Sequence, residues 1–257
     1  MDTATTRQIE VTPPATPKLS EAQRMLDIFF APTKTFEDIR RSAMWLGPLV
    51  VLIISSFLFT YCAGKRVGWP QITENNMKLA SPAQQERMQA QLEKATPEQR
   101  EQQRSITMKV TQGISYGFPV IILIFTAIFA GLYMLVMNFG LGAELKFNQI
   151  MAITLYSGLV KVVMIAVAIV GLWTFIDPAD FSIQMPLATS PAAFISITDH
   201  PALFKFMSVF DIFNLWSTAL TGLGLAVLSR KSLGACMAVA FGVLIAIGAI
   251  SAAFALV

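Results

Sequence analysis

The chain has 257 residues, of which 54% are hydrophobic and only 14% are charged. Soluble domains of this size carry about 25% charged residues, so the composition indicates a polytopic integral membrane protein. The net charge of +3 gives no basis for nucleic-acid binding, and two cysteines with one histidine favour neither a disulfide framework nor a metal site.

The N-terminal 42 residues divide into a predicted disordered tail, 1–19, and amphipathic interfacial helices over 20–42. Ser20 is expected to cap the first helix, Pro32 to end it, and Thr35 to cap a second short turn. The expected apolar side comprises Ala22, Met25, Leu26, Phe29 and Phe30, with Glu21, Arg24 and Asp27 opposite and with Phe36 and Ile39 on the second turn.

Arg40 and Arg41 follow at the membrane border, where anionic headgroups attract basic side chains. This amphipathic segment either covers the inner face of a helix bundle or docks a partner.

Five apolar stretches are long enough to cross about 30 Å of hydrocarbon as helices. They cover residues 43–63, 114–138, 149–173, 206–228 and 232–256. The fold class is therefore an all-α membrane domain over 43–257. Ser229-Arg230-Lys231 joins the last two spans so tightly that an antiparallel hairpin is expected.

The polar loop 65–112 between the first two spans contains two similar segments. Each begins with a hydroxyl residue, a proline and then a glutamine: Ser81 with Gln84, and Thr96 with Gln99. This spacing is typical of a capping box with proline in the first turn. We expect two short helices forming a solvated hairpin.

The orientation of the chain in the membrane is predicted from its shortest connections. The lysines and arginines near all the spans divide equally between the two sides of the membrane and so do not decide it. Arg230 and Lys231 fill the last turn, whereas the connection 174–205 carries Asp177, Asp180 and Asp199. The positive-inside rule then places the N-terminus in the cytoplasm.

Lys161 lies at the centre of the third predicted span, where a lysine costs about 2.5–3.5 kcal/mol by insertion scales. We expect it to face the bundle interior and pair with Asp211, in the first two turns of the fourth predicted span, with Asn214 one turn further. This polar pair either holds helices together or lines an ion or substrate path. The only proline of the second span, Pro119, lies near its start, so the sequence signals no break in the middle of the membrane.

Four small residues recur at intervals of four in the fifth predicted span: Gly234, Ala238, Gly242 and Ala246. Such spacing lets two helix backbones approach closely. The stripe is expected to pack against the fourth span, with a dimer seam as the alternative.

Several stretches resemble the Yip (Ypt-interacting protein) membrane domain family. They are "LDIFFAPTKTFEDIRR" before the first span, "FNQIMAITLYSGLV" at the third, and "DIFNLWSTALTGLGLAVLSRKSLGACMAV" across the last two. Five spans with a tight last hairpin also agree, and the resemblance covers roughly 25–257. The eukaryotic motifs Asp-Leu-Tyr-Gly-Pro and Gly-Tyr-Gly-Leu-Ser are absent, which indicates a prokaryotic-type member.

The resemblance implies a scaffold or accessory protein that binds another membrane protein or itself, in membrane organisation or traffic. No HExxH, GxSxG, Walker or GxGxxG motif occurs, so we expect no enzyme activity and no cofactor. The alternative function is a transporter or channel component that uses Lys161 and Asp211. The expected location is the bacterial cytoplasmic membrane, with an ER or Golgi membrane as the alternative.

Overall fold

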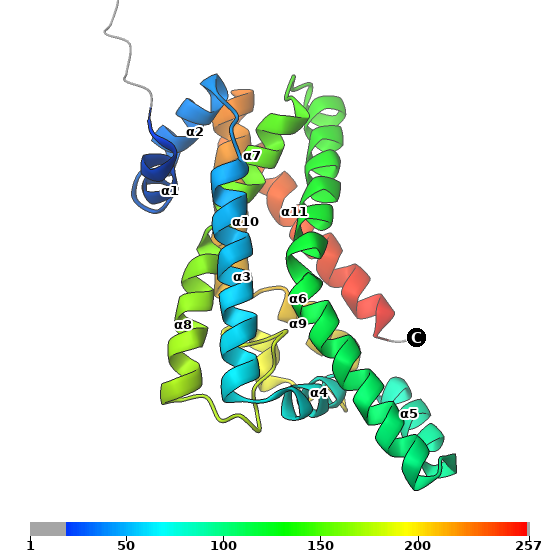
Figure 1. The fold of residues 1–257 in the computed structure, drawn as a ribbon. Helices are drawn as coiled ribbons and strands as arrows, with labels where there is room; N and C mark the ends of the chain where they lie inside the picture. The colour runs from blue at the N-terminus through cyan, green and yellow to red at the C-terminus, as the bar shows by residue number, and fades with distance from the viewer. Residues whose placement is uncertain (1–18, 256–257) are drawn as a thin grey trace, which may run out of the picture.

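The computed structural model describes residues 19–255, and all regular secondary structure in that range is helical (Figure 1). Within residues 19–255, five helical segments are long and apolar enough to cross a membrane, which confirms the predicted fold class. The tail predicted for residues 1–19 lies outside the described residues, apart from Leu19, as does the end of the fifth predicted span.

Two short helices open the described chain. In α1 (Glu21–Phe30) the Ser20 side chain accepts from the Gln23 backbone and the Gln23 side chain accepts from the Ser20 backbone, so the predicted cap is present. The second helix, α2 (Pro32–Arg41), begins at Pro32 and not at Thr35. Proline suits the first turn of a helix because its φ is already helical, so Pro32 starts the second helix as well as ending the first.

The first span is α3 (Leu46–Arg66), three residues later than predicted at each end. It is followed by α4 (Trp69–Lys78), which the sequence reading did not predict, and by α5 (Pro82–Lys94). Both predicted capping boxes are present, at Ser81 and Thr96.

The second predicted hairpin helix is not separate, because it continues into the second span as α6 (Pro97–Leu135). Its 39 residues at about 1.5 Å each give roughly 58 Å, nearly twice the thickness of the hydrocarbon. With α5 it therefore forms an arm that extends beyond the bundle (Figure 1). The helix passes through Pro119 without ending and is followed by a short π-helix, η1 (Val136–Gly140).

The third and fourth predicted spans are both interrupted. The third consists of α7 (Phe147–Gly158) and α8 (Val160–Thr174), which meet at Leu159. The fourth starts only at α10 (Ile212–Ser229), and the segment before it forms α9 (Pro201–Ser208), preceded by a 3-10 turn, η2 (Pro191–Phe194).

The last span, α11 (Leu233–Phe254), forms the predicted hairpin with α10, and Arg230 takes the left-handed conformation with φ 56° at the turn. The core lies where α10 and α7 meet α3, α6 and α2, around Ile150, Tyr156 and Leu225.

Candidate functional site

The N-terminal helices are joined by a buried ion pair. Arg24 Nε lies 2.6 Å from Asp38 Oδ2, and the guanidinium also donates to the carbonyl of Ser42 at 3.0 Å. The Thr35 hydroxyl donates to the Arg24 carbonyl at 3.3 Å. Arg24 is only 1% exposed, so its predicted place on the polar outer side is wrong. Its partner lies in the next helix, which a single-helix pattern does not show.

The apolar residues of α1 divide between the bundle and the outside. Met25 and Phe29 pack against the core, and the Phe29 ring meets Trp216 edge-on at 5.9 Å. Leu26 and Phe30 are exposed, Phe30 to 86%. The bundle therefore covers only part of the apolar side of α1.

The second helix, α2, inserts into the bundle. Phe36 and Ile39 are fully buried, and α2 contacts both α10 and α7. Gly224 of α10 makes room for this contact, because a Cβ there would lie 2.8 Å from the Phe36 ring and 2.7 Å from Ile153. Arg40 and Arg41, both exposed, follow at the C-terminal end of α2.

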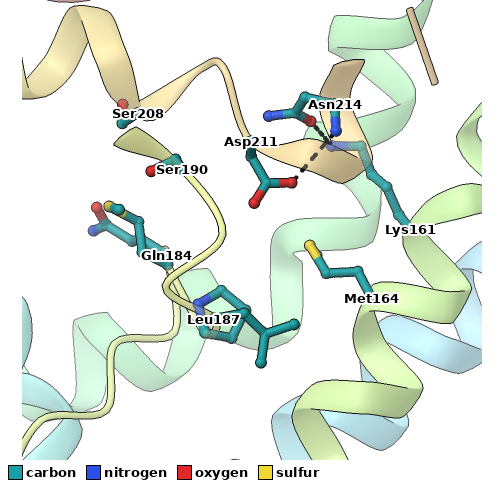
Figure 2. A pocket seen from close by; sticks show the side chains of 10 residues that line it. Lys161, Met164, Gln184, Leu187, Ser190, Ser208, Asp211 and Asn214 are labelled. Carbon is teal, nitrogen blue, oxygen red and sulfur yellow. Dashed lines mark hydrogen bonds between the residues drawn. The ribbon is translucent and has the colours of Figure 1, made fainter. Parts of the chain in front are cut away.

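The polar group predicted inside the membrane comes together around Asn214. Lys161 Nζ donates to Asn214 Oδ1 at 2.8 Å. Asp211 Oδ1 in turn accepts from the backbone N–H group of Asn214 at 3.4 Å (Figure 2). It also accepts from the backbone N–H group of Phe213 at 2.9 Å.

Lys161 and Asp211 do not form a direct ion pair within 4.0 Å, and Asn214 links them. Asp211 was predicted to lie within the first two turns of the fourth span, and this is wrong. It is the N-cap of α10, and its carboxylate accepts a further hydrogen bond from the Thr189 hydroxyl. An aspartate at that position satisfies donors that the first helical turn leaves free.

A cavity of about 110 Å³ adjoins this group, between α8, α10 and the connection that precedes η2. Six of its lining side chains are polar: Lys161, Gln184, Ser190, Ser208, Asp211 and Asn214. The cavity therefore lies next to the break at Leu159 in the third span and next to the start of the fourth span. The sequence did not predict that this connection lines a cavity, although its hydroxyl residues Thr189 and Ser190 between prolines were a usable signal.

The small-residue stripe of α11 faces away from the rest of the chain. Gly234, Ala238, Gly242 and Ala246 are all exposed, and an added Cβ at Gly234 or Gly242 would meet nothing within 4 Å. The expectation that this stripe packs against the fourth span is therefore wrong.

The opposite side of α11 packs against α10, the helix of the fourth span. Cys236 and Ala240 are buried there, and Met237 packs so closely on Gly222 of α10 that a Cβ on Gly222 would lie 2.6 Å from the sulfur. The glycine that allows the close approach is thus on α10.

Comparison with known proteins gives one family. The family model described as the Yip1 domain matches residues 26–255, which is nearly the whole described chain. Neither the curated proteins nor the solved structures contain a significant match.

Proposed function

Since this chain belongs to the Yip1 domain family, we propose that it is a non-enzymatic membrane scaffold or accessory protein that binds another membrane protein. Its apolar spans and its family are consistent with a role in membrane organisation or traffic. We place it in the bacterial cytoplasmic membrane with α1 and α2 on the cytoplasmic side, where Arg230 and Lys231 also lie.

The exposed stripe on α11 carries this proposal. Glycine within a helix costs about 1 kcal/mol relative to alanine, so Gly234 and Gly242 weaken α11 unless a close contact compensates. Within the described chain neither glycine has such a contact. Small residues at this spacing favour a helix of a second membrane-embedded chain, because van der Waals contact and interhelical hydrogen bonds drive association in lipid.

The experiment is site-specific photocrosslinking in native membranes. A photoreactive residue replaces Ala238 at the centre of the stripe, and cross-linked proteins are identified by mass spectrometry. We expect one defined partner band, which Gly242→Leu removes because the larger side chain blocks close approach.

Gly131→Leu is the matched control, because Gly131 also lies in a span and a Cβ there meets nothing within 4 Å. This variant should leave the partner band unchanged. Cross-linking only to a second copy of the chain would identify a homo-oligomer, and no protein adduct, or one insensitive to Gly242→Leu, would contradict the proposal.

The interrupted third span favours a second candidate function, that of a transporter or channel component. Transport sites often lie where membrane helices are discontinuous, and here the break at Leu159 and the start of α10 after Asp211 lie beside one polar cavity. A solute or ion flux in proteoliposomes that Lys161→Met abolishes would support it, and the absence of flux across a panel of small ions and solutes would argue against it.

A further inference from the structure

The cavity beside Lys161 has the charge and the hydrogen-bonding groups of an anion site. We propose that it binds a small monovalent anion, of the size of chloride or formate, through the ammonium group of Lys161 and the hydroxyl of Ser190. This inference does not depend on the scaffold function, and binding there does not require transport.

Hydrogen-bond accounting gives the first argument. A lysine ammonium has three N–H donors, and Asn214 Oδ1 accepts from one of them. The Asp211 carboxylate, in contrast, already accepts from Thr189, Phe213 and Asn214. The spare capacity of the two charged groups is therefore on the donor side, which selects a ligand that accepts hydrogen bonds.

Charge gives the second argument. Lys161 and Asp211 are the only charged side chains that line the cavity in the described part of the chain. Asp211 caps the N-terminus of α10, whose helix dipole supplies about half a positive charge there. The formal charges of Lys161 and Asp211 cancel, and the N-terminus of α10 adds a partial positive charge, so the wall of the cavity is not net negative.

Ser190 is an independent sign of a ligand. It is only 4% exposed, it lines the cavity, and its hydroxyl oxygen makes no hydrogen bond to any described residue. Buried hydroxyls almost always have a partner, because an unsatisfied buried polar group is costly. A hydroxyl donor without a partner at the wall of this cavity is the kind of group that a bound anion would satisfy.

Size and wall chemistry restrict the ligand further. The volume of about 110 Å³ corresponds to roughly three or four water molecules at about 30 Å³ each. Met164 and Leu187 form an apolar part of the wall, as Figure 2 shows. A chloride or formate ion with one or two waters fits this space, whereas a phospholipid headgroup with its glycerol is larger.

The test is the thermal unfolding midpoint of the full chain in a non-ionic detergent without added phospholipid. Sodium chloride and sodium formate are titrated against sodium gluconate at constant sodium concentration. A ligand that binds only the folded state raises the midpoint in a concentration-dependent, saturable way. We expect this rise with chloride or formate and not with gluconate, whose anion is too large.

Two variants and one control locate the site. Ser190→Ala should require at least threefold more anion for half of the rise, and Lys161→Gln should abolish the rise. Lys205→Gln is the matched control, because Lys205 lies in neighbouring α9 but does not line the cavity. The anion response of this variant should equal that of the natural protein.

If Lys161→Gln does not fold, Ser190→Ala decides the question alone. An equal response to gluconate, no response, or an unchanged response in Ser190→Ala would overturn the proposal.

Discussion

Arg24 in α1 and Asp38 in α2 form an ion pair with 2.6 Å between Nε and Oδ2, and both side chains are almost fully buried. Removing one partner of a buried pair leaves an uncompensated charge and typically costs about 3–5 kcal/mol. Arg24→Met should therefore lower the free energy of unfolding by that amount. A denaturant titration in mixed micelles measures the change.

The matched control is the exposed pair of Asp27 and Lys34, whose Nζ–Oδ2 distance is 2.9 Å. Lys34→Met should change stability by less than about 1 kcal/mol, because solvent screens exposed pairs. Combining Arg24→Met with Asp38→Leu should recover part of the loss. Equal effects of Arg24→Met and Lys34→Met would show that burial does not set the strength of the first pair.

Two glycines offer a second comparison. Gly224→Ala places a Cβ 2.7 Å from Ile153 and 2.8 Å from the Phe36 ring, so neighbouring side chains must shift. We expect a loss of about 1–3 kcal/mol, as overpacked cores show. Gly242→Ala meets nothing within 4 Å and should raise the stability of the isolated chain by up to about 1 kcal/mol through helix propensity. Both are measured in the same unfolding assay, and the same sign for both would contradict the packing of α2 on α10.

The sequence predicts the membrane-embedded part of the fold well, because the length of an apolar run is a strong constraint in lipid. It fails where the deciding contact is distant. Arg24 has the spacing of a polar-face residue, and only the position of Asp38 in a separate helix turns it inward.

The interruptions of the third and fourth spans were hidden for a related reason. Gly158 directly precedes Leu159, but a single glycine is common inside membrane helices and does not by itself predict a break. Asp211 lies within the predicted span 206–228, where one aspartate does not interrupt the apolar pattern. Periodicity likewise identifies the stripe that includes Gly242 but does not show which way it faces.

The link between Lys161 and Asp211 leads to a double-mutant prediction. Lys161→Met leaves Asp211 without a nearby cation, and Asp211→Asn keeps a helix cap but leaves Lys161 without a nearby carboxylate. Each single change should destabilise the protein, and the double change should cost less than the sum by about 0.5–3 kcal/mol. Strict additivity in the unfolding assay would show that Asn214 alone, and not the two charges, holds this group together.

Five spans place α2 and the turn after η1 on one side of the membrane, and α5 and the connection after α8 on the other. Single cysteines at Glu37 and Glu144 should then react with an impermeant thiol reagent only in inverted vesicles, and cysteines at Glu93 and Asp180 only in intact cells. All four positions are exposed, so a lack of labelling on one side reports sidedness and not burial.

For this experiment the free thiols of Cys62 and Cys236 are first replaced by alanine, and the resulting cysteine-free protein serves as the unlabelled control. Labelling of the Glu37 and Glu93 positions from the same side would refute the span count, because a single span, α3, separates them.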